Sequence, residues 1–103
     1  MKERVPPEDC ARMEDIRHGI DTLDQHIVTL LAERMRYIEA AARVKQQRDL
    51  VRDEARKAAV IANACRTAEA SGLDTNLVED LYELLVERSI AHEFERFDEE
   101  AAS

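Results

Sequence analysis

An apolar stripe that runs from Glu14 to about Gln47 limits the possible folds of this chain more than any other feature. The residues of its first half recur at alternating intervals of four and three, which places them on one face of an α-helix. They are Ile16, Ile20, Leu23, Ile27 and Leu30. The sequence therefore predicts one long, uninterrupted helix over this stretch.

Two cations continue the stripe at positions where apolar residues are expected. The same spacing leads to Arg34, returns to apolar residues at Ile38 and Ala41, and then reaches Lys45. A buried cation without a partner is costly, so an acidic side chain or an anionic ligand should lie opposite each one unless its head reaches water. Because both cations share one face of the helix, we favour a ligand.

The length of this helix indicates a dimer. About 33 residues at ~1.5 Å each span roughly 50 Å, whereas a compact domain of about 100 residues has a radius of gyration of about 13 Å. Half of the helix would lack an apolar cover unless a second copy of the chain supplied one. We therefore expect an intertwined homodimer in which the long helices pack on each other.

The composition favours a single all-α domain over residues 1–103. The chain has 45% hydrophobic residues, only two glycines and two prolines, and no stretch with the alternation of a β-strand. A net charge of −8 argues against nucleic acid or an anionic membrane as a partner. Without a signal peptide or a spanning segment, the expected location is the cytoplasm.

The sequence offers no set of metal ligands. His18 and His26 are too far apart on a helix to bind one ion, and Cys10 and Cys65 fit free thiols better than a disulfide framework. We therefore expect neither a metal nor another cofactor.

A lead-in and a connector interrupt the helical pattern. Residues 1–12 contain adjacent prolines and should be largely extended, and residues 48–53 break the helical period. A second helix should run from Asp53, whose side chain suits the N-cap, to about Ala70, beyond which Gly72 suits the C-terminal cap. With a third helix after it, the chain has three helices, one long and two shorter.

The third helix, expected from Thr75 to about Phe97 with Asp74 as its N-cap, also loses its apolar character partway along. Ser89 and Glu93 stand where its apolar stripe should continue, so this face turns polar where a pocket could lie. The alternative for Glu93 is that it belongs to the acidic stretch that ends in a tail at residues 98–103.

Arg17 is a third cation of interest. It precedes Arg34 by seventeen residues, or about 25 Å along a helix axis, so it cannot serve the same pocket from the same chain. In an antiparallel helix pair the start of one helix lies beside the middle of the other, and Arg17 could then reach the partner's site. The alternative is an exposed arginine paired with Asp21.

Four short motifs mark the long helix, and three of them carry these cations. They are Asp15-Ile16-Arg17, Ile20-Asp21, Leu31-Ala32-Glu33-Arg34 and Arg43-Val44-Lys45. No single motif is specific, but with three basic residues at these separations the chain resembles the all-helical chorismate mutase family, including its isochorismate pyruvate lyase branch. The resemblance covers nearly the whole chain.

The resemblance implies a pocket that binds chorismate, a small dicarboxylate, within a homodimer. Arg17 would come from the other subunit, whereas Arg34 and Lys45 would come from one long helix and act as catalytic cations. Lys45 would also donate to the ether oxygen. The implied reaction, a pericyclic rearrangement to prephenate, needs no nucleophile. Catalysis would come from holding the reactive conformer and from preorganised positive charge.

The resemblance also assigns residues beyond the long helix. Asp53 and Arg56 lie in a segment similar to the one that closes over the substrate in mutases, and Ser89 matches a serine near the ring carboxylate. Glu93 stands where bacterial members commonly carry a catalytic glutamine beside the ether oxygen. Because a carboxyl group donates a hydrogen bond only when protonated, Glu93 would act as its neutral acid. Lys57 replaces a glutamate that contacts the substrate hydroxyl in some mutases.

Several functions are compatible with this scaffold. Pro7-Glu8-Asp9-Cys10 resembles the opening of the isochorismate pyruvate lyases, which convert isochorismate to salicylate plus pyruvate. Residues 51–53 and Ser89 look more like mutase positions, and the lyases rely on glutamine where Glu93 stands, so we favour a chorismate mutase. A 4-amino-4-deoxychorismate mutase and a non-catalytic helical dimer are further alternatives.

Overall fold

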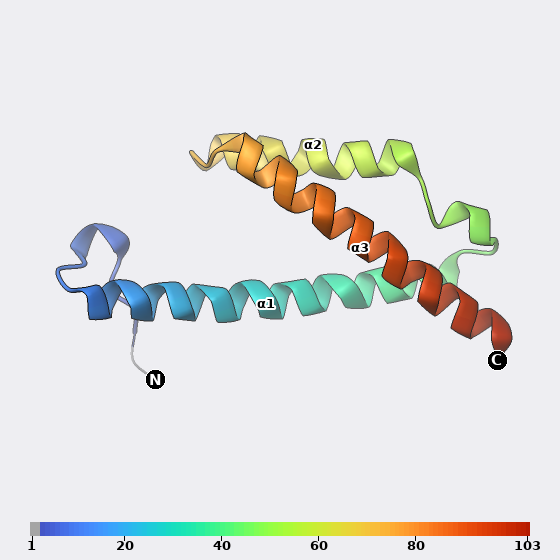
Figure 1. Cartoon of the computed structure of the whole chain (residues 1–103), viewed down its shortest axis with the longest axis horizontal. Helices are drawn as coiled ribbons and strands as arrows, with labels where there is room; N and C mark the ends of the chain where they lie inside the picture. Colours follow the sequence, from blue (N-terminus) through green and yellow to red (C-terminus); the bar gives the residue numbers. More distant parts are fainter. Residues whose placement is uncertain (1–2) are drawn as a thin grey trace. The chain divides into compact units, whose positions relative to one another are not determined.

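Three α-helices and two short 3-10 helices make up the computed structural model, which describes residues 3–103 (Figure 1). In chain order they are η1 (Pro7–Asp9), α1 (Met13–Val44), η2 (Arg48–Leu50), α2 (Glu54–Ala70) and α3 (Thr75–Ala102). No residue from 3 to 103 lies in a β-strand. The predicted all-α class and the three helices are therefore confirmed. None of the described helices is long and apolar enough to cross a membrane.

The helix caps predicted from the sequence are present. Asp53 Oδ1 accepts from the backbone N–H of Arg56 at 2.9 Å, and Asp74 Oδ1 accepts from the N–H of Asn76 at 2.9 Å. Each bond satisfies one of the N–H groups that a helix start leaves without an intrahelical partner. Gly72 follows α2 with φ of 72°, the left-handed conformation that favours glycine at this place.

Two helix ends differ from the sequence-based expectation. α1 ends at Val44 rather than near Gln47, because Gln47 adopts an extended conformation with φ of −136° and ψ of 143°. Lys45 therefore follows the helix, and its N–H still bonds to the Ala41 carbonyl at 3.0 Å. α3 continues to Ala102, well past Phe97, so most of the expected acidic tail is helical. Good helix formers and the absence of Gly and Pro there favour this continuation.

The described chain divides into two compact units, with the boundary inside α1 after Arg36. In the first unit, η1 and its flanking residues fold back beside the start of α1 and enclose a pocket of about 160 Å³. Val5, Cys10, Ile16 and Ile20 are among its lining residues. The apolar stripe of α1 is open beyond this pocket, since Ile27 is 53% exposed and Leu30 63%.

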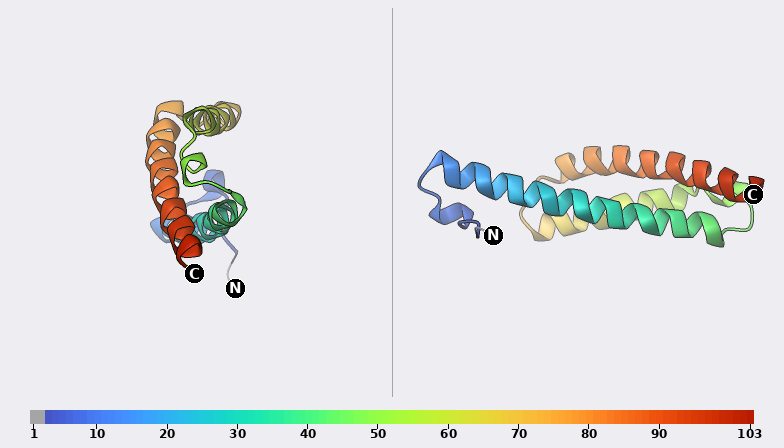
Figure 2. Two further views of the ribbon diagram at one scale, coloured as in Figure 1. Left: turned by 90° about the vertical axis from the view of Figure 1, so that its right-hand side faces the viewer. Right: turned by 90° about the horizontal axis from the view of Figure 1, so that it is seen from below.

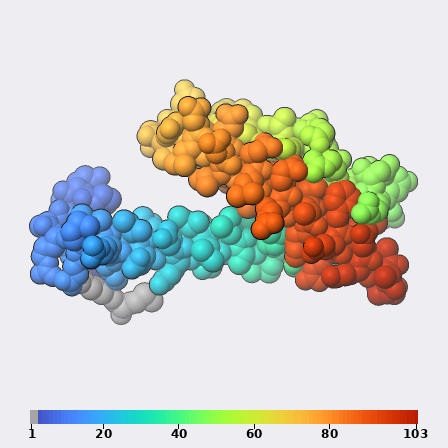
Figure 3. Space-filling model, in the orientation of Figure 1, coloured from blue at the N-terminus to red at the C-terminus, as the bar shows by residue number. Residues whose placement is uncertain are grey.

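The second unit, Tyr37–Ser103, contains a helical hairpin formed by α2 and α3 (Figures 1 and 2). Val51, from the connector between η2 and α2, is buried together with Val86 and Ile90 of α3. Partly buried residues that pack against these three are Val60, Ile61, Tyr82, Phe94 and Phe97. The space-filling view shows the connector, in green, directly against the C-terminal part of α3, in red (Figure 3).

Arg48 fixes η2 to the C-terminal part of α3. Its guanidinium lies 4.5 Å from the centre of the Phe94 ring and donates to both carboxylate oxygens of Asp98, at 3.0 and 3.3 Å. The hydrogen bonds and charge of Asp98 raise the pKa of Arg48 above its ordinary value. The stacked and bidentate geometry is one that arginine, but not lysine, can form.

Candidate functional site

Two polar residues are buried on the face of α3 that packs into the second unit. Ser89 is 3% exposed and Glu93 is 5% exposed, and they are the buried polar residues of the described chain. Ser89 lies three residues after Val86, and Glu93 lies three residues after Ile90, so polar residues interrupt the buried apolar face of this helix, as expected from the sequence. The Ser89 hydroxyl donates to the Leu85 carbonyl at 2.7 Å.

Lys45 meets Glu93 at the end of α1. Its Nζ lies 2.6 Å from Glu93 Oε2, with the lysine side chain 28% exposed and the glutamate side chain 6%. The two atoms are at ion-pair distance, but Oε2 is a buried oxygen that receives no hydrogen bond in the described chain. Nζ also donates to the Val51 carbonyl at 3.4 Å. Of the two partners that the sequence allows opposite Lys45, an acid or an anionic ligand, the structure places an acid there, Glu93. The pair presents a half-buried cation and a buried anion to an incoming ligand.

The start of α2 follows Lys45 in the chain, after η2 and the connector. Asp53 uses its carboxylate to cap α2 through the N–H of Arg56, and the side chains of both residues are exposed. Val51, which accepts from Lys45, is only two residues before Asp53. The connector therefore links the Lys45 contact to the segment that carries Asp53 and Arg56.

Arg17 and Arg34 belong to the first unit. Both lie on α1, where Arg17 is exposed and Arg34 is half-buried. Of the residues predicted for the site, the structure thus brings Lys45 and Glu93 into contact, with Ser89 one turn earlier on α3. The role expected for Arg17 depends on a second subunit, whereas Arg34 is expected to serve the site of its own chain.

A network of charges that the sequence did not reveal joins the connector and α2 to α3. Arg52 donates to both carboxylate oxygens of Glu87, at 2.8 and 3.2 Å, and to Glu54 at 2.8 Å. Lys57 Nζ donates to Glu83 at 2.6 Å and to Glu87 at 2.9 Å. The hydrogen bonds from Arg52 and then Lys57 lower the pKa of Glu87 to about 2. Lys57, whose role was open from the sequence, is thus engaged with two acids of α3.

A second cluster joins the end of α1 to α3. Glu39 Oε2 lies 2.8 Å from His92 Nε2 and accepts from Arg96 at 3.1 and 3.3 Å. The hydrogen bonds of His92 and Arg96 lower the pKa of Glu39. The spacing of four between His92 and Arg96 is the only sequence signal for this cluster, because its acid lies more than fifty positions away.

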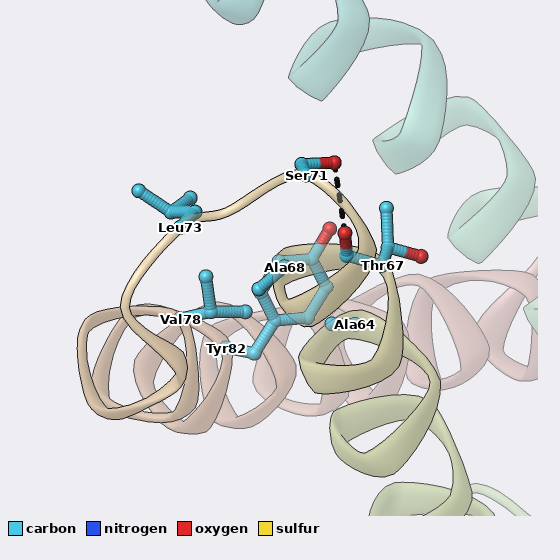
Figure 4. A pocket seen from close by; sticks show the side chains of 7 residues that line it. All are labelled: Ala64, Thr67, Ala68, Ser71, Leu73, Val78 and Tyr82. Atoms are coloured by element: carbon cyan, nitrogen blue, oxygen red, sulfur yellow. Dashed lines mark hydrogen bonds between the residues drawn. The ribbon is translucent and has the colours of Figure 1, made fainter.

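The pocket at the tip of the hairpin is a poor candidate for an anion site. It has a volume of about 240 Å³ and lies where α2 turns into α3 (Figure 4). Its lining residues are Ala64, Thr67, Ala68, Ser71, Leu73, Val78 and Tyr82, none of which is charged. A dicarboxylate would find no cation there to offset its desolvation.

The charge network predicts a loss of stability in acid. Glu87 has a lower pKa in the folded chain than its ordinary value of 4.5, so its contribution to stability is present above pH 4.5 and is lost as the pH falls toward about 2. Because the Glu87 side chain is 39% exposed, this contribution is small, and urea unfolding midpoints measured across this window should fall only slightly more for the wild type than for Glu87→Gln. Glu79→Gln, an exposed acid on the same helix, is the control and should follow the wild type. Parallel curves for wild type and Glu87→Gln would contradict this prediction.

Comparison with known proteins gives three findings. Residues 16–94 match the family described as chorismate mutase type II. A Pseudomonas aeruginosa protein named isochorismate pyruvate lyase is 39% identical over 87 residues, which cover 84% of this chain and 86% of that protein. The T-protein of Haemophilus influenzae is 29% identical over 82 residues, which cover 79% of this chain but only 22% of that longer protein.

Proposed function

Because this chain belongs to the chorismate mutase type II family, we propose that it is an isochorismate pyruvate lyase, which converts isochorismate to salicylate plus pyruvate. The observation that carries the proposal is the 39% identity to a lyase over most of both chains. The identity to the T-protein is lower and covers only a part of that protein. This proposal reverses the preference for a mutase that the sequence motifs alone had favoured.

The engagement of Lys57 supports the lyase over the mutase. Some mutases carry a glutamate at this position, where it contacts the substrate hydroxyl. A lysine ammonium has no acceptor atom, and this one is already bound to Glu83 and Glu87. That mutase contact is therefore missing here. Ser89, which resembles a mutase serine, is the feature that keeps chorismate mutase as the second candidate.

In the proposed reaction the chain supplies positive charge and holds the substrate in its reactive conformation. Lys45 donates to the ether oxygen of the substrate, where negative charge develops as the C–O bond breaks, and Arg34 binds a substrate carboxylate. Asp53 and Arg56 bring the start of α2 over the substrate, and Ser89 faces its ring carboxylate. No nucleophile or cofactor takes part in this scheme. As the ether C–O bond breaks, the hydrogen on the ring carbon that bears the hydroxyl passes to the methylene carbon of the enolpyruvyl group, which leaves as pyruvate while the ring becomes aromatic, all within a substrate held in its reactive conformer.

We propose a homodimer as the form that completes the site. Ile20, Ile27 and Leu30 of α1 are 53%, 53% and 63% exposed, an apolar stripe of the kind that a second subunit covers. Arg17 stands on the same helix and is exposed, so an antiparallel partner helix could carry its guanidinium to the other subunit's site.

One experiment separates the candidate functions. Purified protein is incubated with isochorismate and, separately, with chorismate, and the products are followed as salicylate plus pyruvate or as prephenate. Salicylate and pyruvate in equal amounts from isochorismate are the expected result. Prephenate from chorismate without lyase turnover would identify a mutase, and no product from either substrate would point to a non-catalytic dimer.

The Lys45–Glu93 pair predicts the effect of an amide at position 93. A bound dianion competes with the Glu93 carboxylate for Lys45, whereas a glutamine side chain is uncharged and can donate a hydrogen bond to the substrate. Turnover of Glu93→Gln at saturating isochorismate should therefore equal or exceed that of the wild type. A large loss of turnover in Glu93→Gln would show that the carboxylate itself is needed.

A further inference from the structure

The connector between η2 and α2 determines where the Lys45 ammonium lies. The Val51 carbonyl accepts from Lys45 Nζ at 3.4 Å, and the Val51 side chain is 3% exposed among Val86 and Ile90. Two residues later Asp53 caps α2. A shift of this connector relative to α3 would move the Val51 carbonyl and, with it, a contact that directs Lys45 toward Glu93.

Arg52 holds this connector from the outside. The Val51 side chain points into the core. The guanidinium of Arg52 forms a bidentate ion pair with Glu87, in which Nη2 lies 2.8 Å from Oε1 and Nη1 lies 3.2 Å from Oε2. Such a fork fixes both distance and orientation, which a single hydrogen bond does not. The connector is therefore pinned to α3 on two sides, by an apolar contact and by an ion pair.

Glu87 also binds the first turns of α2. Its Oε2 accepts from Lys57 Nζ at 2.9 Å, so one carboxylate holds a cation on either side of the Asp53 cap. Glu83 shares Lys57, at 2.6 Å, whereas the acids that bind Arg52 are Glu87 and Glu54. Glu87 is thus the acid through which the connector and α2 are both fixed to α3.

The network is too exposed to matter chiefly for stability. The side chains of Arg52 and Glu87 are 41% and 39% exposed, and ion pairs at such exposure contribute little to the free energy of unfolding. Their geometry is nevertheless well defined, because Glu87 is bound at both oxygens. Loss of this ion pair can therefore displace nearby groups by a significant amount while it changes the free energy of unfolding little.

We propose that Glu87 is a positioning residue for the active site. Through Arg52 and Lys57 it fixes the connector 51–53 on α3, which places the Val51 carbonyl that directs Lys45 and the cap from which α2 begins. The inference rests on the proposed function, since Lys45 must contact the substrate for its position to affect the rate. Glu87 itself does not touch the substrate in this scheme.

The first test compares two isosteric substitutions. Glu87→Gln loses the charge that holds both cations, whereas Glu83→Gln loses one contact of Lys57 and leaves the Arg52 fork intact. Because a displacement of about 1 Å can cost up to about 100-fold in rate, we expect kcat/KM with isochorismate to fall by about tenfold for Glu87→Gln and by less than about twofold for Glu83→Gln. Equal losses in the two variants would overturn the proposal.

The second test asks whether Glu87 acts through Lys45. In a Lys45→Met background, Glu87→Gln should cost clearly less than the tenfold that it costs in the wild type, because Lys45, one of the groups that the connector places, is gone. If the full tenfold loss persists in this background, Glu87 affects the rate by another route and the proposal fails.

A third measurement does not depend on turnover. Backbone amide exchange in residues 51–53 should be faster in Glu87→Gln than in the wild type, while the urea midpoint at neutral pH and the exchange of α3 amides change little. Unchanged exchange at the connector would overturn the proposal. If the wild type formed no product from isochorismate or chorismate, the proposed function would fail, whereas this exchange result would still decide whether Glu87 holds the connector.

Discussion

Replacing Lys45 with methionine is expected to lower kcat/KM for isochorismate by about 100- to 1,000-fold, the range seen when one preorganised donor to a developing negative charge is removed. Methionine keeps a stem of similar length but has no charge. The loss should fall mainly on kcat, because the ether oxygen gains its charge only as the C–O bond breaks. Steady-state kinetics of salicylate release provide the measurement.

Two controls separate this effect from unfolding. Lys45→Met leaves the buried Glu93 carboxylate without its counter-ion, which destabilises the fold. The double variant Lys45→Met/Glu93→Gln removes both charges and should regain the wild-type urea midpoint while it stays inactive. Arg88→Gln, an exposed cation on α3, should keep wild-type activity. An active Lys45→Met variant would remove Lys45 from the mechanism.

Arg17→Ala and Arg34→Ala are each expected to lose about 100-fold or more in kcat/KM as separate homodimers, and to regain activity when their subunits are mixed. If Arg17 crosses to the partner's site, a mixed dimer contains one site with both arginines and one site with neither. Random pairing at equal amounts makes half of the dimers mixed, and half of their sites are complete, so about a quarter of the wild-type activity should return.

The matched control mixes Arg34→Ala with Lys45→Met. Both of these residues are proposed to serve the site of their own subunit, so each site of the mixed dimer lacks one of them and no activity should return. Recovery in this control, or no recovery when Arg17→Ala and Arg34→Ala are mixed, would contradict the exchange of Arg17 between subunits. Size-exclusion chromatography would check that each variant is still a dimer.

The sequence predicted the helices well because their signals are local. The alternating spacing of apolar residues marks α1, while Asp53, Gly72 and Asp74 mark helix ends through interactions within a few residues. The end of α3 was less predictable, because acidic residues near Asp98 suit an exposed helix as well as a loose tail. Local pattern cannot separate these two states.

The polar part of the site was predicted only where it interrupts an apolar stripe. Lys45, Ser89 and Glu93 each occupy such a position, and Lys45 and Glu93 are in contact. Arg52 and Glu87 carry no such signal, since charged residues on exposed helix faces are common and their contact spans 35 positions in the chain. Single residues could not decide between a lyase and a mutase, because Ser89 favours a mutase whereas the overall identity to a lyase favours a lyase.

The buried apolar side chains of the described chain are alanines, valines and one isoleucine, and none of its larger side chains is fully buried. A single chain with so few buried side chains has a small free energy of unfolding. Association with a second copy would increase this free energy in proportion to the logarithm of the protein concentration. If the chain forms the proposed homodimer, dilution should therefore lower its free energy of unfolding, and the amount of protein made in a cell would help to set the fraction that is folded.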